Sequence, residues 1–208
     1  MTALSIKSPL VSVEWLHQNL GASNLIILDA SIKKVTDTDS APIAESYIIS
    51  SRFFDLKNKF SDVSVSFPNA FPSVEQFEKE AKALGINTDS AIVVYDNKGV
   101  YSSPRVWWLF KSFGFNNIAV LDGGLPEWKK KGFPVEDQIQ YKTTTRGNFE
   151  AKYQKGMIKF FEDILEASNN SQHLIIDARS EQRFNSLIPE PRVGLRSGQI
   201  PNSKNLPF

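Results

Sequence analysis

The sequence contains no cysteine. Disulfide bonds, zinc sites with thiolate ligands and a sulfur nucleophile are therefore excluded within these 208 residues. Histidine is almost as scarce, because only His17 and His173 occur, and neither has an acidic residue at the spacing of a catalytic motif. We therefore expect both histidines on a helix face or a strand edge, and we predict no metal site and no cofactor.

Long apolar runs and an excess of charge of one sign are also missing. The apolar runs are far shorter than the roughly 20 residues that cross a bilayer. Lysine and arginine number 24 and aspartate and glutamate 23, and no basic run is longer than Lys129–Lys131. We therefore predict no membrane and no nucleic-acid partner. The first residues lack the charged-then-apolar order of a secretory signal, so the expected location is the cytoplasm.

Short apolar runs that alternate with amphipathic stretches indicate an α/β fold. The runs at 25–29, 91–95 and 118–121 are predicted strands without polar alternation, which is typical of a parallel sheet flanked by helices on both faces. Helices are predicted after Ser12, Ser73 and Ser103 and from Gly124, ending at Gly21, Gly85, Gly114 and Gly132.

The beginning of this pattern occurs twice. Leu25–Ser31 returns as Leu174–Ser180, and 47–54 corresponds in position to 199–206. We therefore expect a first domain at 8–135, a linker at 136–147 and the N-terminal part of an incomplete second domain at 148–208. Residues 148–208 form too few elements to close a sheet, so we expect them to be loosely ordered or to lean on the first domain.

The loop that follows the predicted strand at 91–95 is the first place to seek chemistry, because ligands gather at the carboxyl ends of parallel strands. It consists of Asp96, Asn97, Lys98, Gly99, Val100, Tyr101 and Ser102. A tight loop that enters a helix directs backbone N–H groups at one point and forms an anion cradle. Asp96 is itself an anion, so we infer that its carboxylate fills the cradle and would repel an anionic substrate. An ordinary Asp–Asn turn without a cradle is the alternative.

A serine hydrolase is disfavoured at this loop, because Gly99–Ser103 lacks the second glycine of a nucleophile elbow.

Several motifs together resemble a known family. The segments 96–108 and 121–128 are similar to the first domain of tandem rhodanese-type sulfurtransferases, the thiosulfate and 3-mercaptopyruvate enzymes. Asp177–Ser180, Pro189–Arg192 and Ser197–Pro201 are similar to the opening of the second domain. The resemblance extends from about Val11 to Phe208, and the order and spacing of the motifs make it specific.

The resemblance implies a rhodanese-like first domain that is non-catalytic and the beginning of a second that carries the nucleophile. In the family, a cysteine in the loop equivalent to 96–102 attacks a sulfane sulfur and holds it as a persulfide. We expect that cysteine beyond Phe208, so the full-length protein is predicted to transfer sulfur and this chain alone to be inactive. The implied partners are a small anionic sulfur donor and a thiol or cyanide acceptor, and the protein is expected to be a monomer.

The resemblance also assigns two arginines. Arg183 matches the arginine that binds the anionic end of the donor, and Arg192 matches a second one associated with mercaptopyruvate. Without the family, each would be a surface arginine. A guanidinium suits both roles, because its planar fork grips a carboxylate with two hydrogen bonds.

Two further positions bear on the choice of donor. In mercaptopyruvate enzymes a first-domain aspartate and histidine assist a serine near the cysteine. Asp62 matches the aspartate, but Asn69 stands where the histidine is expected, and an amide does not relay protons near neutral pH. The resemblance therefore leaves the donor open. The competing interpretation is a non-catalytic rhodanese-like module for binding or regulation, as in proteins related to cell-cycle dual-specificity phosphatases, which share this fold.

Overall fold

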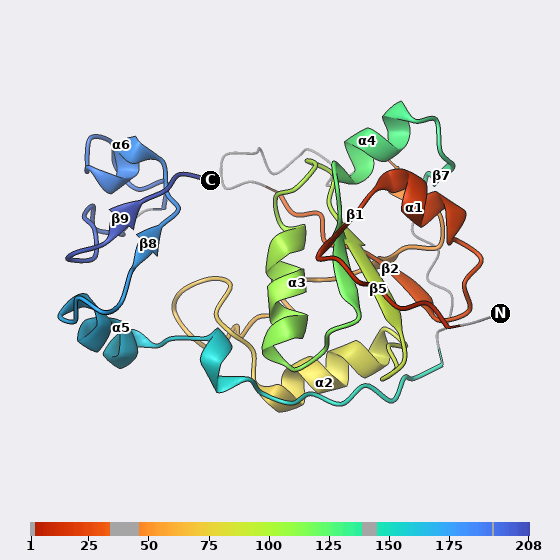
Figure 1. Ribbon diagram of the computed structural model, residues 1–208, viewed down its shortest axis with the longest axis horizontal. Helices are drawn as coiled ribbons and strands as arrows, with labels where there is room; N and C mark the ends of the chain where they lie inside the picture. The colour runs from red at the N-terminus through yellow and green to blue at the C-terminus, as the bar shows by residue number, and fades with distance from the viewer. Residues whose placement is uncertain (1–2, 34–45, 139–144, 193) are drawn as a thin grey trace. The chain divides into compact units, whose positions relative to one another are not determined.

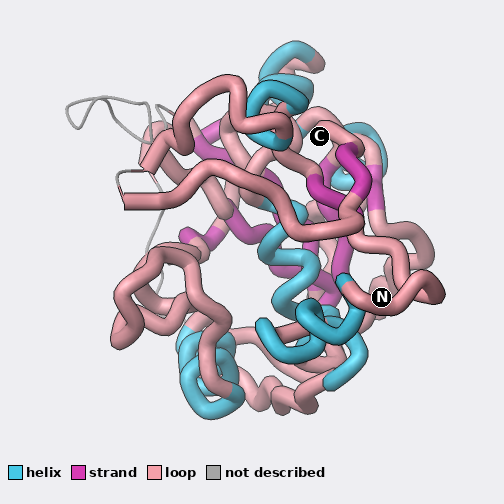
Figure 2. The backbone as a smooth tube through the Cα atoms, turned by 90° about the vertical axis from the view of Figure 1, so that its left-hand side faces the viewer, coloured by secondary structure: helices cyan, strands magenta, loops and turns pink. Residues whose placement is uncertain are grey.

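The computed structural model describes residues 3–33, 46–138, 145–192 and 194–208, and the chain divides into two compact units (Figure 1). Unit 1 ends at Gln154, and unit 2 extends from Lys155 to Phe208. Loops make up much of the backbone between short helices and strands (Figure 2). Within the described residues, no helix has the length and apolar character needed to cross a membrane.

A parallel sheet of five strands forms the centre of unit 1, in the order β1-β6-β5-β2-β4. The strands are β1 (Leu10–Val11), β2 (Leu25–Asp29), β4 (Arg52–Phe53), β5 (Ala91–Tyr95) and β6 (Ile118–Leu121). β5 pairs with both β2 and β6, and all of its residues are buried. The predicted α/β fold with a parallel sheet is confirmed. β1 and β4 were not predicted, because strands of two residues leave no apolar run to recognise.

Helices cover both faces of this sheet. The helices are α1 (Val13–Gln18), α2 (Val74–Ala83), α3 (Ser103–Ser112) and α4 (Gly124–Lys130). Successive side chains of a strand point to opposite faces. Ile27 and Val93 therefore pack with α1 and α4, whereas Leu28 and Val94 pack with α2 and α3. This two-sided cover explains why β2 and β5 are apolar without alternation.

Serine side chains cap the first two helices as predicted. The hydroxyl of Ser12 accepts the N–H of Trp15 at 3.2 Å, and that of Ser73 accepts the N–H of Gln76 at 3.1 Å. α1 ends at Gln18, before the predicted Gly21. α3 also differs from prediction, because its N-cap is Ser102 and not Ser103.

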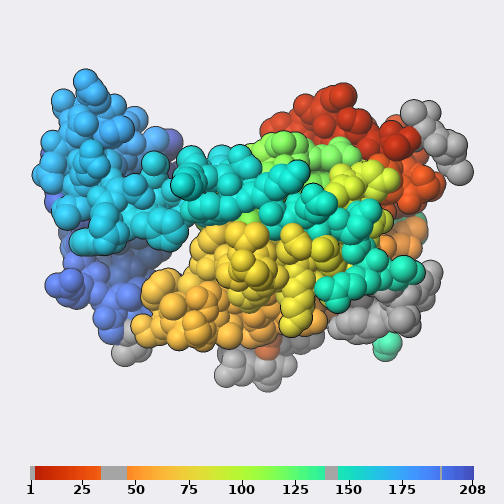
Figure 3. All heavy atoms as spheres, turned by 90° about the horizontal axis from the view of Figure 1, so that it is seen from below, coloured from red at the N-terminus to blue at the C-terminus, as the bar shows by residue number. Residues whose placement is uncertain are grey.

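Residues 145–154 belong to unit 1, which differs from the predicted domain boundary at 148. The N–H of Gly147 donates to the carbonyl of Lys82 at 2.8 Å, and that of Phe149 to the carbonyl of Ile86 at 3.1 Å. The ring of Phe149 is fully buried in the aromatic core. Figure 3 shows this segment along the surface beside α2. The boundary therefore follows Gln154.

The predicted linker at 136–147 is thus only partly a connector. Its first residue lies in β7 (Val135–Glu136), which pairs antiparallel with β3 (Tyr47–Ile48). Its last residue, Gly147, packs on unit 1. Residues 139–144 lie outside the described part of the chain.

Unit 2 contains a 3-10 turn η1 (Lys155–Met157), α5 (Phe161–Ser168), β8 (Ile176–Asp177), α6 (Glu181–Phe184) and β9 (Lys204–Asn205). Several of its large apolar side chains are exposed, such as Phe161 at 74% and Leu206 at 64%. The loose order expected for this unit remains a prediction.

The repeat inferred from the sequence is confirmed by the backbone. β8 pairs with β9 in parallel, with Asp177 opposite Asn205, as β2 pairs with β4 with Asp29 opposite Phe53. Ser50 and Asn202, which correspond in the repeat, both adopt left-handed backbone conformations, with φ of 60° and 61°.

Candidate functional site

The Asp96 carboxylate occupies a cradle of hydrogen-bond donors at the carboxyl end of β5. Its Oδ2 accepts the N–H groups of Tyr101 at 2.7 Å, Ser102 at 3.0 Å and Ser103 at 3.0 Å, and the Ser103 hydroxyl at 2.7 Å. Its Oδ1 accepts the N–H of Lys98 at 2.9 Å. The side chain is fully buried. The carboxylate thus fills the cradle as predicted, and the alternative of a turn without a cradle is excluded.

The cradle keeps Asp96 ionised. Burial opposes the charged form, but the hydrogen bonds from Tyr101, Ser103 and Lys98 outweigh burial and hold the pKa of Asp96 below its usual value. The loop also enters the N-terminus of α3, whose dipole favours a negative charge. A fixed buried anion therefore stands where an anionic ligand would otherwise bind.

The loop is closed against α4. The carbonyl of Asp96 accepts the N–H of Leu125 at 3.0 Å. Gly124 approaches so closely that a Cβ there would lie 2.4 Å from the carbonyl oxygen of Gly99 and 2.6 Å from that of Asp96. The loop is also tied to the segment that follows β2, because Asn97 donates its N–H to the hydroxyl of Ser31 at 3.0 Å. The loop is therefore held on two sides.

A second buried carboxylate, Asp29, lies at the end of β2 and was missed as a site residue. Its Oδ1 accepts both the N–H and the hydroxyl of Ser31, whereas its buried Oδ2 has no hydrogen-bond partner among the described residues. Burial, together with the charge of Asp96, raises the pKa of Asp29 despite the bonds from Ser31. The repeat offered a signal, because Asp29 corresponds to Asp177.

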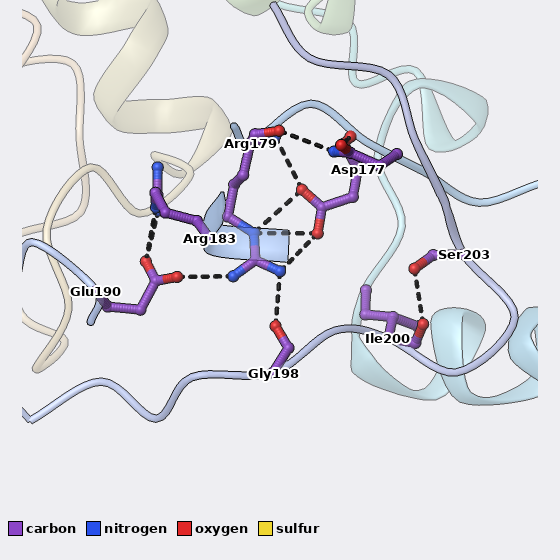
Figure 4. Close-up of polar contacts among 8 residues, drawn as sticks. Asp177, Arg179, Arg183, Glu190, Gly198, Ile200 and Ser203 are labelled. Atoms are coloured by element: carbon purple, nitrogen blue, oxygen red, sulfur yellow. Dashed lines mark hydrogen bonds and ion pairs between the residues drawn. The ribbon is translucent and has the colours of Figure 1, made fainter. Parts of the chain in front are cut away.

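In unit 2, Asp177 has an arginine partner (Figure 4). Arg179 donates from Nε to both Asp177 oxygens, at 3.1 Å and 3.0 Å, and from Nη2 to Oδ2 at 2.7 Å. The hydrogen bonds from Arg179 lower the pKa of Asp177. Arg179 also donates from Nη2 to the carbonyl of Gly198 at 2.7 Å. All of these contacts lie at the carboxyl end of β8.

Arg183, a predicted ligand-binding residue, lies on α6 and pairs with Glu190. Its Nε donates to Glu190 Oε2 at 3.2 Å, and its Nη2 donates to the same oxygen. Glu190 Oε1 accepts Nη1 of Arg179 at 2.8 Å. The ion pairs with Arg183 and then Arg179 lower the pKa of Glu190. The structure therefore places Arg183 in a cluster with Asp177, Arg179 and Glu190, none of which was predicted as a site residue.

Arg192, the second predicted ligand-binding residue, is exposed. Within the described residues, Glu190 forms its ion pairs with Arg179 and Arg183, and none with Arg192. Arg192 is therefore not among the residues joined by the ion pairs of Asp177, Arg179, Arg183 and Glu190.

Asp62 and Asn69 lie near each other, because Asp62 pairs with Ala70 across an isolated bridge. The carboxylate of Asp62 accepts the N–H of Ser64 at 2.8 Å and its hydroxyl at 2.6 Å. Asn69 adopts a left-handed backbone with φ of 59°, and its carbonyl accepts a hydrogen bond from Arg105. Asp62 and Asn69 thus lie in the same part of the fold, but neither can exchange a proton near neutral pH as a histidine can.

His17 stacks on Phe133 with ring centroids 4.1 Å apart, as expected for a histidine on a helix face. Among the described residues, no group of histidine, aspartate and glutamate is arranged to hold a metal ion.

Comparison with known proteins gives consistent matches. The rhodanese-like domain matches residues 12–131. The thiosulfate/3-mercaptopyruvate sulfurtransferase 1 of Arabidopsis thaliana is 38% identical over the whole chain, which covers 60% of that protein. The 3-mercaptopyruvate sulfurtransferase of Mus musculus is 33% identical, also over the whole chain, which covers 72% of it.

A solved structure is similar as well. The crystal structure of SseA from Escherichia coli, described as a 3-mercaptopyruvate sulfotransferase, matches with a TM-score of 0.84 and 29% identity, covering 97% of this chain and 75% of that one. The chain spans 60% of the length of the Arabidopsis sulfurtransferase 1 and 66% of that of a second Arabidopsis relative, thiosulfate/3-mercaptopyruvate sulfurtransferase 2.

Proposed function

This chain belongs to the rhodanese-like family, and on that premise we propose that the protein is a sulfurtransferase. It would move a sulfane sulfur from thiosulfate or 3-mercaptopyruvate to a thiol or cyanide acceptor. Relatives that are 33–38% identical over the whole chain carry these activities in their names, which supports the proposal.

The observation that carries the proposal is the filled cradle at the end of β5. Five donors converge on the carboxylate of Asp96, and the same arrangement around a cysteine would stabilise a thiolate. The repeat of β2 and β4 as β8 and β9 supports a second domain with an equivalent loop. The sequence contains no cysteine, so the nucleophile would be supplied by residues other than these 208.

The proposed reaction has two steps. The cysteine thiolate attacks the outer sulfur of thiosulfate, a sulfur–sulfur bond forms on the enzyme, and the sulfur–sulfur bond of the donor breaks to release sulfite. Cyanide or a thiolate then attacks the outer sulfur of the persulfide, which returns the cysteine thiolate. With 3-mercaptopyruvate, a carbon–sulfur bond breaks instead, and the leaving carbon takes up a proton to give pyruvate.

Arg183 would bind the anionic end of the donor, and Arg192 would add a second cation for mercaptopyruvate. The position of Arg183 on α6, beside Glu190, which also binds Arg179, supports the first assignment. Arg192 is exposed, so a ligand can reach it from solvent.

The second candidate function is a non-catalytic module for binding or regulation. The observation that favours it is the Asp96 carboxylate itself, which leaves the loop at 96–102 with neither a cysteine nor a vacant anion cradle.

The test combines an assay with the sequence of the transcript beyond the codon for Phe208. The 208-residue chain is expected to form no thiocyanate from thiosulfate and cyanide. A reading frame that continues to a cysteine in a short loop before a helix should give an active protein, and changing that cysteine to serine should abolish turnover. Thiocyanate formation by the 208 residues would contradict the proposal, and a stop codon after Phe208 would favour the module.

A further inference from the structure

Glu190 binds two arginines at once, with a different oxygen for each (Figure 4). Oε1 accepts Nη1 of Arg179, and Oε2 accepts Nε and Nη2 of Arg183. The side chain of Glu190 is only 5% exposed, so this carboxylate is almost removed from water. Pro189 and Pro191 flank it, and a proline restricts both its own backbone and that of the residue before it. Glu190 is therefore held by its backbone as well as by its charges.

Arg179 is anchored independently of Arg183. Its Nε and Nη2 bind Asp177 on β8, and Nη2 also binds the carbonyl of Gly198. The carbonyl of Asp177 in turn accepts the N–H of Leu206 at 3.0 Å, next to β9. With all three nitrogens engaged, Arg179 connects the small sheet of unit 2 to Glu190 and has little capacity left for a ligand.

Arg183 is bound along one edge of its guanidinium. The N–H groups of Nε and Nη2 face Glu190. Among the described residues, no hydrogen bond occupies the outer edge formed by Nη1 and the second N–H of Nη2. That outer edge presents two parallel donors, the geometry that grips a carboxylate or an oxyanion. The side chain is 31% exposed, so a ligand can reach it from solvent.

We infer that Glu190 is a positioning residue, which fixes Arg183 on its inner edge and presents the outer edge to the anionic group of the sulfur donor. The inference rests on the proposed function, because it takes Arg183 as the donor-binding residue. It adds a role for Glu190, and a supporting one for Arg179, neither of which contacts the donor. Without the carboxylate, the guanidinium would sample many orientations, and the ligand would have to order it on binding.

Glu190→Gln separates an effect of net charge on anion binding from an effect of Arg183 positioning, because the two change the affinity in opposite directions. Asp177 and Glu190 balance Arg179 and Arg183, so the formal charges of the cluster cancel. Glu190→Gln keeps the size of the side chain and makes the cluster positive. Attraction of an anion by charge alone would then strengthen binding, whereas loss of positioning would weaken it.

The experiment measures binding of pyruvate and of thiosulfate to the 208-residue chain by NMR of arginine side-chain N–H groups. Glu190→Gln is expected to weaken binding about threefold to tenfold, the cost of ordering one long side chain. It should also speed solvent exchange of the Arg183 Nε proton without any ligand. Glu181→Gln on α6 is the matched control, because Glu181 is exposed and its loss changes the charge equally. Its affinity should equal or slightly exceed that of the wild type.

A second variant tests the binding role of Arg183 if Glu190→Gln unfolds unit 2. Arg183→Lys keeps the charge opposite Glu190 but lacks the fork, and it should also weaken binding. Wild-type affinity in a folded Glu190→Gln, with weakened binding in Arg183→Lys, would overturn the role of Glu190 and leave the proposed function standing. Wild-type affinity in Arg183→Lys, or no binding by the wild type, would remove Arg183 from the proposed function and the inference with it.

Discussion

The hydroxyl of Ser103 donates to Oδ2 of Asp96 at 2.7 Å, and the N–H of Ser103 donates to the same oxygen at 3.0 Å. A residue in the first turn of α3 thus donates two hydrogen bonds to the carboxylate of Asp96, the residue that follows β5. Sequence reasoning assigned Ser103 the role of helix cap, but in the structure Ser102 holds that position. Because the helix begins one residue earlier than expected, the Ser103 side chain is not needed as the N-cap and can bind Asp96.

Asp96→Asn should destabilise unit 1 by roughly 2–3 kcal/mol. Hydrogen bonds to a charged carboxylate are stronger than those to a neutral amide, and the NH2 group of the asparagine would face N–H donors of the loop. Urea unfolding followed by tryptophan fluorescence measures the effect. All four tryptophans, Trp15, Trp107, Trp108 and Trp128, lie in unit 1. The exposed Asp137 provides the control, and Asp137→Asn should change stability by less than about 0.5 kcal/mol. Equal stabilities of the two variants would contradict the importance of the cradle.

Asp29 and Asp96 should give opposite dependences of stability on pH. The pKa of Asp96 is lowered on folding, so its stabilisation is present above the unfolded value of about 3.9 and is lost as the pH falls through the folded pKa. The pKa of Asp29 is raised on folding, so the folded state holds that proton more tightly. Its contribution is therefore present below about pH 3.9 and is lost as the pH rises through the folded pKa.

Asp29→Asn should remove this second dependence. Its stability relative to the wild type is expected to increase between about pH 4 and pH 7, because only the wild type must ionise a buried carboxylate that has an unpaired oxygen. Urea unfolding at several pH values provides the measurement, with Asp137→Asn as a reference. Parallel curves for Asp29→Asn and the wild type would show that Asp29 ionises without cost.

Gly124→Ala should cost at least about 2 kcal/mol, because the new Cβ would collide with two carbonyl oxygens and the backbone is left-handed. The carbonyls of Gly99 and Asp96 lie 2.4 Å and 2.6 Å from that Cβ, and φ of Gly124 is 53°. Gly21→Ala is the matched control in the same unit, because nothing lies within 4 Å of a Cβ at Gly21. A Gly124→Ala protein as stable as Gly21→Ala would show that the loop at 96–102 is not clamped by α4.

Phe149→Ala should destabilise unit 1 by about 3–5 kcal/mol, because the ring is fully buried in the aromatic core. Phe161→Ala removes the same ring from an exposed position, 74% accessible, and should leave the fluorescence-detected transition unchanged. The same unfolding assay compares them. Equal midpoints for Phe149→Ala and the wild type would move the boundary of unit 1 back toward the predicted linker.

The sheet and the cradle were predictable because their determinants are local. β2, β5 and β6 are apolar runs, and Asp96 is the first residue of a loop that leads from β5 into a helix. Phe149 was not predictable in this way, since one aromatic residue in a polar stretch has no periodicity. Its burial depends on a backbone pairing with Ile86, far away in the sequence.

The pairing of Arg183 with Glu190 could not be predicted from the sequence for a related reason. The two residues are seven positions apart, on a short helix and a loop, so neither helical nor strand spacing connects them. The unpaired oxygen of Asp29 could not be predicted from the sequence either. The repeat shows only that Ser31 stands where Arg179, the partner of Asp177, stands in unit 2.

Asp96→Cys should give a thiol whose pKa lies below the ordinary value of about 8.5, because donors that stabilise a carboxylate also stabilise a thiolate. The chain has no other cysteine, so ultraviolet absorbance of the thiolate against pH reports the introduced group alone. Absorbance needs no access by a reagent, which matters because position 96 is fully buried.

The control for this substitution is Val63→Cys, since Val63 is 69% exposed in the same unit. Its thiol should titrate near the ordinary value. If the thiol at position 96 titrates at or above the control in a folded protein, burial outweighs the N–H donors for sulfur. The cradle would then be specific for a carboxylate, and an equivalent loop would not be expected to activate a cysteine. A lower value at position 96 would show that unit 1 retains the electrostatics of a sulfur-transfer loop and lacks only the sulfur.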